Sequence, residues 1–205
     1  KNIKISDVEN LGAEFYKKIN YGKNSEYFLI SDSAVSKIDN FLGYFLHGLK
    51  LKSYEFKKYK TKKDTRSISI NIIGNKNIPS NQNQLRFKAL EEGTFYARDL
   101  VSEPGNILHP DEYAKRLSSL RKDGLKISIY DEKKLKKLGM FSLLGVGQGS
   151  VRGSYLVTME WNGAKNSSKP LAFVGKGVCF DTGGYSLKPA KFMEDMTYDM
   201  AGSAT

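Results

Sequence analysis

Hydrophobic positions in the first third of the chain alternate between helical and strand spacing. The segment Ser6–Glu9 (SDVE) has the form of a capping box and predicts a helix that runs to about Ile19. The apolar run Glu26–Ile30 (EYFLI) predicts a strand. Ser33 is then predicted to cap a second helix with one wide apolar stripe, formed by Val35, Ile38, Phe41, Leu42, Phe45, Leu46 and Leu49. This helix must pack against another element.

A basic and aromatic segment and a second strand follow this helix. Residues Lys52–Lys63 (KSYEFKKYKTKK) interleave basic side chains with the aromatic residues Tyr54, Phe56 and Tyr59. We favour a solvated edge whose aromatic rings pack inward, although a phosphate-binding patch with stacking rings has the same pattern. Strict alternation over Ser67–Ile73 (SISINII) predicts a strand with one apolar face, formed by Ile68, Ile70 and Ile72.

The polar run Gly74–Gln84 (GNKNIPSNQNQ) is the strongest linker signal in the chain. It separates a first region, residues 1–74, from a second region, residues 85–205, with residues 75–84 as the linker. We therefore expect a domain boundary within this run.

Helices and strands alternate in the second region. A helix is predicted over Leu85–Ser102 and is stopped by Pro104 and Gly105. The elements expected after it are a helix following Pro110, a strand at Lys126–Tyr130, a short helix at Glu132–Leu138, and strands at Tyr155–Trp161 and Leu171–Phe180. This order is typical of the α/β class.

Composition narrows the classes of protein. The 205 residues are 40% hydrophobic, enough for a sizeable core, and the formal net charge is +11. This charge is compatible with binding to nucleic acid or to an acidic surface, but a lysine-rich solvated surface explains it as well. The single cysteine, Cys179, excludes an internal disulfide and a cysteine-based zinc cage. No apolar run reaches the ~18 residues of a membrane span, and no signal segment opens the chain, so a cytoplasmic location is expected.

Several motifs that suggest chemistry are weak. With only His47 and His109, the chain offers no histidine-rich zinc site, and packing roles are favoured for both. Gly175-Lys176-Gly177 lacks the other residues of a nucleotide-binding phosphate loop, and Gly145–Ser150 is better explained as a glycine-rich turn than as a dinucleotide fingerprint. A buried, inert thiol is favoured over a nucleophile at Cys179, because no histidine accompanies it in the motif.

Carboxylates and lysines gather in one window near the end of the chain. The stretch Val174–Gly184 (VGKGVCFDTGG) sets charged residues among apolar residues and glycines, where they are costly unless something binds them. The ionisable residues of the window are Lys176, Asp181, Lys188, Glu194, Asp195 and Asp199. Aspartate oxygens suit hard divalent cations, and a lysine can join them only as a neutral amine, which desolvation and an adjacent dication favour. A plain ion-pair cluster on a loop remains the alternative.

The window VGKGVCFDTGGYSLKPAKFMEDMTYDMAGSA resembles the signature of the leucyl aminopeptidases, the cytosol aminopeptidase family of two-metal exopeptidases. The matching residues are a lysine, an aspartate five residues on, a second lysine twelve on, and an aspartate twenty-three on. The resemblance extends upstream through Ala97–Pro110 and Lys136–Ser150, and residues before the linker resemble the end of the family's N-terminal domain. It therefore covers most of the chain.

The resemblance implies a role for each of four residues. Lys176, Asp181 and Asp199 fall on the family's metal ligands, with Asp181 expected to touch both ions, and Lys188 falls on its catalytic lysine. The implied cofactors are two divalent ions per subunit, Mn²⁺ or Zn²⁺, which activate a hydroxide. The implied reaction is removal of the N-terminal residue, leucine-like by preference, from peptides with a free N-terminus during intracellular protein turnover.

The implied fold is α/β: the C-terminal part of an α/β N-terminal domain, followed by the first part of an α/β metallo-exopeptidase catalytic domain with a central mixed sheet. Family members form homohexamers, and no membrane partner is implied. The family's later NTDAEGR segment, which completes the metal site and supplies a catalytic arginine, has no counterpart here. We therefore expect a fragment with little activity of its own.

Two other functions stay open from the sequence. A basic DNA-binding or architectural relative of the same family is the main alternative, and a relative that has lost catalysis is the other. The sequence leaves undecided which metal is native and which N-terminal residue is preferred. Met193 follows Lys188 by five residues and suits either a specificity pocket or the core.

Overall fold

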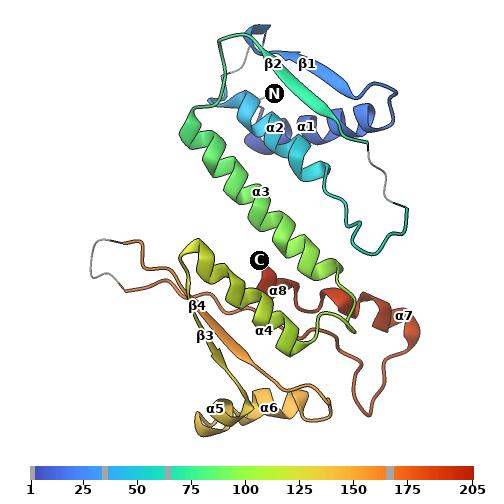
Figure 1. Cartoon of the computed structure of the whole chain (residues 1–205), viewed down its shortest axis with the longest axis vertical. Helices are drawn as coiled ribbons and strands as arrows, with labels where there is room; N and C mark the ends of the chain where they lie inside the picture. The colour runs from blue at the N-terminus through green and yellow to red at the C-terminus, as the bar shows by residue number, and fades with distance from the viewer. Residues whose placement is uncertain (1–2, 34–36, 63–65, 165–168) are drawn as a thin grey trace. The chain divides into compact units, whose positions relative to one another are not determined.

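The computed structural model describes residues 3–33, 37–62, 66–164 and 169–205, and confirms the α/β class (Figure 1). The chain forms two compact units, Lys1–Tyr96 and Ala97–Thr205. The division falls within a long helix, whereas the sequence suggested a linker at 75–84. The domain boundary that we expect within residues 75–84 remains a prediction.

The first helix, α1, spans Ile5–Asn20, so the predicted helix is confirmed. Its capping residue differs from the expectation. Ser6 already lies inside the helix, and the residue before it, Lys4, donates its backbone N–H to Asp7 Oδ2 at 2.8 Å. The predicted capping box at Ser6 is therefore wrong, because Asp7 serves as the acceptor for Lys4 instead.

The second helix, α2, spans Phe41–Lys52 and begins later than predicted. Ser33 ends a short 3-10 turn rather than capping the helix. Asn40 has a φ of 60°, a left-handed conformation that separates the preceding bend from the helix. Ile38 precedes the helix, and Val35 lies outside the described residues. The apolar stripe is therefore shorter than the sequence suggested.

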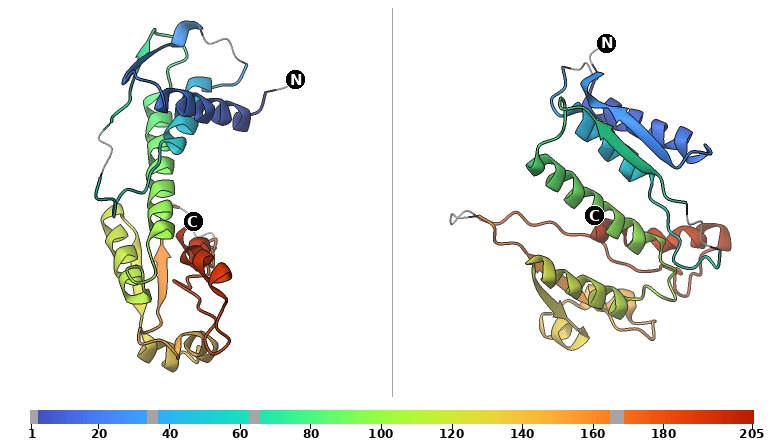
Figure 2. Two further views of the ribbon diagram at one scale, coloured as in Figure 1. Left: turned by 90° about the vertical axis from the view of Figure 1, so that its right-hand side faces the viewer. Right: turned by 45° about the horizontal axis from the view of Figure 1, so that its top comes forward.

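A two-stranded parallel sheet accompanies these helices. Strand β1 (Glu26–Ile30) has the predicted bounds, and β2 (Ser69–Ile73) starts two residues later than predicted. Helices α1 and α2 lie on one face of this sheet in the views of Figures 1 and 2. Phe15 of α1 stacks edge-on against Tyr27 of β1, with ring centroids 6.3 Å apart.

Glycines allow α1 and α2 to approach closely. A Cβ added at Gly12 would lie 1.9 Å from the carbonyl oxygen of Phe45, and one added at Gly48 would lie 1.9 Å from that of Glu9. Both neighbours are backbone atoms of the opposite helix, so any side chain at either glycine would force the helices apart.

The longest helix, α3, spans Asn81–Ser102 and starts four residues before the predicted Leu85. Near its start, Phe87 is buried and stacks on His47 of α2. His47 is itself buried, and its Nδ1 lies 3.0 Å from Glu91 Oε1, which confirms the packing role expected for this histidine.

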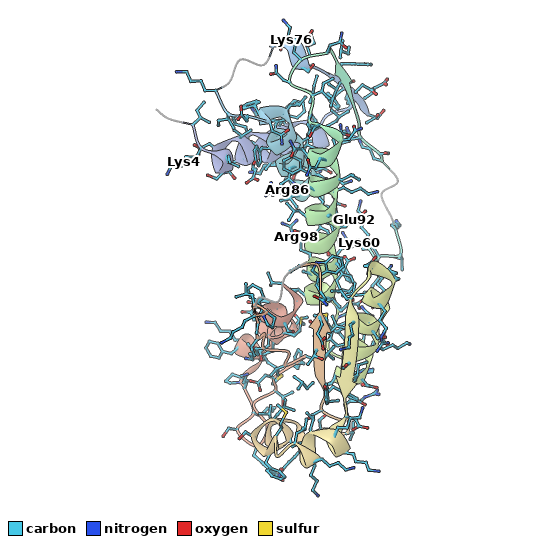
Figure 3. The ribbon with its side chains drawn as sticks, turned by 90° about the vertical axis from the view of Figure 1, so that its left-hand side faces the viewer. Lys4, Lys60, Lys76, Arg86, Glu92 and Arg98 are labelled. Carbon is cyan, nitrogen blue, oxygen red and sulfur yellow. The ribbon has the colours of Figure 1, made fainter. Side chains whose placement is uncertain are left out.

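Charged side chains follow one another along α3, as the labelled Arg86, Glu92 and Arg98 show in Figure 3. Over the described part of the chain, none of the helices combines the length and apolar content that a membrane crossing needs.

The second unit contains an antiparallel strand pair and short helices. The predicted helix and strands are confirmed as α4 (Pro110–Ser118), β3 (Lys126–Tyr130) and β4 (Leu156–Glu160), and a short helix, α5, spans Glu132–Lys137. A further helix, α6 (Phe141–Gly147), covers part of the stretch that we interpreted as a glycine-rich turn.

The strand predicted over Leu171–Phe180 is wrong. Across the described residues 169–178 the chain has no regular secondary structure, and neither β3 nor β4 pairs with it. Leu171, Phe173 and Val174 are 81%, 87% and 100% exposed. A strand needs a neighbouring strand to complete its hydrogen bonds, and the apolar run alone cannot supply one.

The final segment forms three short helical turns. They are α7 (Ala190–Met193), a 3-10 helix η3 (Glu194–Tyr198) and α8 (Ala201–Ala204). The described chain is therefore helical close to its last residue.

Candidate metal and catalytic site

Two residues that lie 23 positions apart in the sequence meet at this site. Lys176 belongs to the extended segment that precedes Cys179, and Asp199 follows η3. Lys176 Nζ lies 2.5 Å from Asp199 Oδ1, so an ion pair joins the extended segment to the end of η3. The fold therefore brings together two of the three metal ligands that the resemblance implies.

A second lysine–aspartate pair lies in the same unit. Lys188 Nζ is 2.6 Å from Asp181 Oδ2 and 3.1 Å from the Asp181 carbonyl oxygen. It also lies 3.2 Å from the thioether sulfur of Met196. An ammonium group has three N–H donors, and these three contacts give each of them an acceptor.

A tight loop connects the members of the second pair. Asp181 Oδ1 accepts the backbone N–H of Gly183 at 2.9 Å, and the backbone N–H of Lys188 donates to the Thr182 carbonyl at 2.9 Å. Gly183 and Gly184 have φ angles of 89° and 69°, where residues with a Cβ are strained. The glycines thus let the chain reverse and return Lys188 to Asp181.

The two pairs form one electrostatic cluster. The hydrogen bond from Lys188 is the main cause that holds the pKa of Asp181 below its usual range, followed by the hydrogen bond from the backbone of Gly183. Partial burial opposes this shift, whereas the charge of Lys176 adds to it. Asp181 is therefore an ionised carboxylate near two cationic side chains.

Asp199 keeps one carboxylate oxygen without a hydrogen bond. Its side chain is 15% exposed, and its Oδ2 is buried and has no hydrogen-bond partner among the described residues. A buried carboxylate oxygen without a donor is costly, and a cation would satisfy it. This orphaned oxygen fits a divalent metal, whose preferred ligands are carboxylate oxygens.

The described residues hold only part of a metal-binding set. Among them, no three side chains of the types His, Cys, Asp and Glu gather closely enough to hold an ion. The candidate site thus rests on two aspartates and a lysine. Lys176 is 58% exposed, although its neighbours in the sequence are apolar residues and glycines.

Within the described part of the chain, neither Glu194 nor Asp195 forms an ion pair with Lys176 or Lys188. Glu194 and Asp195 lie in η3, where burial, the charge of Asp195 and its hydrogen bond raise the pKa of Tyr198. Met193 ends α7 and is half-buried.

Cys179 and His109 have structural surroundings. Burial, and secondarily the charge of Asp111, raise the pKa of the Cys179 thiol to about 11, so the predicted buried thiol is confirmed. His109 precedes α4 and hydrogen-bonds Asp111 through Nδ1, a loop role of the kind expected.

Two polar residues near Lys176, Ser203 and Tyr113, are not among the site residues predicted from the sequence. The backbone N–H of Ser203 donates to the Lys176 carbonyl oxygen at 3.1 Å, and the Ser203 hydroxyl lies 3.0 Å from that of Tyr113. The glycines on either side of Lys176 were the available signal, because they indicate close approach by another segment.

Comparisons with known proteins identify the family of the chain. The profile of the cytosol aminopeptidase family, catalytic domain, matches residues 95–205. A "Probable cytosol aminopeptidase" of Nitrobacter winogradskyi is 40% identical over 98% of this chain and 41% of its own length. One of Ehrlichia ruminantium is 44% identical over 95% of this chain and 39% of its own length.

Solved structures of similar fold include the following two. The bottromycin maturation enzyme BotP in complex with Mn superposes with a TM-score of 0.80 at 25% identity, covering 99% of this chain and 43% of that one. The cytosol aminopeptidase of Coxiella burnetii superposes with a TM-score of 0.79 at 24% identity, covering 97% and 41%.

The chain spans about two fifths of the length of these relatives. The family match covers more than half of the chain and includes Lys176, Asp181, Lys188 and Asp199. The chain belongs to the cytosol aminopeptidase family.

Proposed function

We propose that the protein containing this chain is a metal-dependent aminopeptidase that removes the N-terminal residue, leucine-like by preference, from peptides. The observation that carries this proposal is that two lysine–aspartate pairs interact electrostatically and that Asp199 of one pair keeps an orphaned carboxylate oxygen. Family membership and the manganese named with BotP support the same chemistry.

In this proposal Lys176, Asp181 and Asp199 hold two divalent ions, Mn²⁺ or Zn²⁺. When bound, the ions supply a nucleophile derived from water and polarise the scissile carbonyl. Asp199 offers its unpartnered Oδ2 to a cation. Lys176 binds as a neutral amine, so it gives up the ion pair that it makes with Asp199 Oδ1.

Lys188 acts as the catalytic lysine. Its ammonium contacts one carboxylate oxygen, one carbonyl oxygen and the sulfur of Met196. A thioether is the weakest of these acceptors, so the substrate carbonyl most readily replaces Met196. Lys188 then donates to the oxygen on which negative charge develops and keeps its proton throughout.

Two aspartates and a lysine are few ligands for two ions, since hard divalent cations take about six each. We propose that the remaining ligands, and a catalytic arginine, come from a part of the protein outside these 205 residues. The 205-residue chain alone is then expected to bind Mn²⁺ weakly and to show little turnover.

The proposal is tested with the intact protein, added Mn²⁺ and a peptide that begins with leucine. Release of leucine should require a free amino group, so an acetylated copy of the same peptide is the matched substrate control. The 205-residue chain is assayed beside it. Cleavage of the acetylated peptide at a similar rate, or robust turnover by the short chain alone, would contradict the proposal.

Homohexamer formation and a cytoplasmic site of action stay predictions. Light scattering of the intact protein tests the first. DNA binding, the alternative suggested by the basic composition, predicts retention on DNA that falls steeply between low and moderate salt.

A further inference from the structure

The segment that carries Lys176 is pressed directly against the backbone of α8. A Cβ added at Gly175 would lie 2.5 Å from Ser203 Cα and 2.6 Å from the Gly202 carbonyl oxygen. One added at Gly177 would lie 3.3 Å from Ser203 Oγ. The glycines on both sides of Lys176 therefore leave room for Ser203, and the Ser203 N–H binds the Lys176 carbonyl between them.

Ser203 is also anchored from its other side. Its hydroxyl donates to the Met200 carbonyl oxygen at 2.8 Å, which uses the single hydroxyl hydrogen of the serine. The hydroxyl of Tyr113 lies 3.0 Å away, so with the Ser203 hydrogen on the Met200 carbonyl the contact between the two side chains has Tyr113 as its donor. Tyr113 is 5% exposed and belongs to α4, which lies near α8 in Figure 1.

This arrangement links Tyr113 to the candidate metal ligands. Ser203 follows Asp199 by about one helical turn, and the Met200 side chain between them is fully buried. The same serine holds the backbone of Lys176. The contact from Tyr113 thus fixes the point at which the Lys176 segment and the segment after Asp199 cross, and so fixes how the two side chains face each other.

We propose that Tyr113 is a positioning residue that acts through Ser203 to hold Lys176 against Asp199 in a geometry that binds divalent metal. The inference rests on the proposed function, because it needs these two residues to be metal ligands. It adds a residue from α4 to the two segments that carry these ligands.

The test is a double-mutant cycle in the intact protein, read out as the dissociation constant for Mn²⁺. Tyr113→Phe removes only the phenol oxygen, and Ser203→Ala removes only the hydroxyl that accepts from it. Each should weaken Mn²⁺ binding by roughly 2- to 12-fold, the range expected for loss of one hydrogen bond. The double variant should be no weaker than the worse single variant, because both changes break one linkage.

Matched controls separate positioning from general loss of structure. Tyr130→Phe and Ser118→Ala remove hydroxyls from β3 and from α4, where the Ser118 hydroxyl donates to the Lys115 carbonyl oxygen of the same helix. Both control variants should bind Mn²⁺ with an affinity within twofold of the wild-type value. The folded fraction of every variant is measured by thermal unfolding at the assay temperature, and affinity is expressed per folded molecule.

The possible outcomes distinguish this inference from the proposed function. If wild-type protein binds Mn²⁺ and Asp199→Asn abolishes binding, but Tyr113→Phe changes nothing, the positioning role of Tyr113 is refuted and the metal site stands. Additive losses in the double variant would also refute it. If Asp199→Asn leaves Mn²⁺ affinity unchanged, the proposed site fails and the inference fails with it.

Discussion

The second unit contains two groups of paired charges that differ in how completely they are satisfied. In the first, Arg116 lies 2.8 Å from Glu103 and 3.0 Å from Glu112, and Glu103 is only 2% exposed. In the second, the pairs of Lys176 with Asp199 and Lys188 with Asp181 include half-exposed side chains and one orphaned carboxylate oxygen.

The difference distinguishes an architectural cluster, which stabilises the fold, from the cluster that we propose binds metal. Burial opposes the charge of Arg116, but its hydrogen bonds to Glu103 and Glu112 hold its pKa above the ordinary value. Its partners therefore stabilise the charge within the fold. Around Asp199 the protein leaves a polar atom unpaired, which costs stability unless a ligand binds. An incompletely satisfied charge cluster thus indicates a binding site.

The largest expected effect is on catalysis at the second cluster. Lys188→Ala in the intact protein should lower kcat by about 100- to 1,000-fold, because it removes a donor to the developing oxyanion. Steady-state kinetics with a leucine-initiated peptide measure this effect. Lys191→Ala, a nearby exposed lysine, is the control and should stay within threefold of wild type. A similarly small change for Lys188→Ala would exclude the catalytic role.

A second prediction concerns metal affinity without loss of stability. Asp181→Asn should weaken Mn²⁺ binding by at least about 10-fold, since even residues that only support metal ligands cost 10- to 100-fold. The midpoint temperature of thermal unfolding, measured without metal, should change little, because the Asp181 side chain is 42% exposed. Asp195→Asn provides the matched control. A large drop in thermal stability would place Asp181 in the architectural class instead.

The architectural cluster should respond in the opposite way. Glu103→Gln removes one partner of a buried ion pair and should lower the free energy of unfolding by about 3 kcal/mol. Its Mn²⁺ affinity per folded molecule should stay within twofold. Glu160→Gln, which breaks the exposed pair with Lys126, should cost less than about 1 kcal/mol. Urea denaturation measures the free energy of unfolding of both variants. Equal losses in the two variants would contradict the structural role assigned to the buried pair.

The smallest effect depends on pH. The hydrogen bond from Arg116 is the main cause that lowers the pKa of Glu112. A lowered carboxyl pKa adds stability above the ordinary value of 4.5, and this stability is lost as the pH falls through the lowered value. Glu112→Gln should therefore cost below about 1 kcal/mol at pH 7 and nothing once Glu112 is protonated in both states. The free energies of unfolding of wild type and Glu112→Gln, measured by denaturation between pH 3 and 7, should converge at the acidic end.

Local patterns in the sequence predicted much of the fold. Strands β1 and β3 have the predicted bounds, and Pro104 and Gly105 stop α3 as expected. Failures arose where distant contacts or backbone geometry decide the outcome. The left-handed Asn40 delays α2, and the apolar run from Leu171 finds no neighbouring strand among the described residues.

The candidate site, like the fold, was predicted from the sequence only in part. The acidic and basic residue types suggested a metal site, and the resemblance assigned the roles. The meeting of Lys176 with Asp199 depends on a crossing of two segments that spacing alone does not reveal. Tyr113 is 90 residues from Ser203 in sequence, so only the structure could connect them.

Anomalous diffraction from crystals of the intact protein soaked in Mn²⁺ tests the central claim most directly. The account predicts manganese peaks within direct bonding distance of Asp181 and Asp199, with Lys176 turned from its ion pair toward the metal. Manganese bound elsewhere, with the pairs of Lys176 with Asp199 and Lys188 with Asp181 both intact, would contradict it.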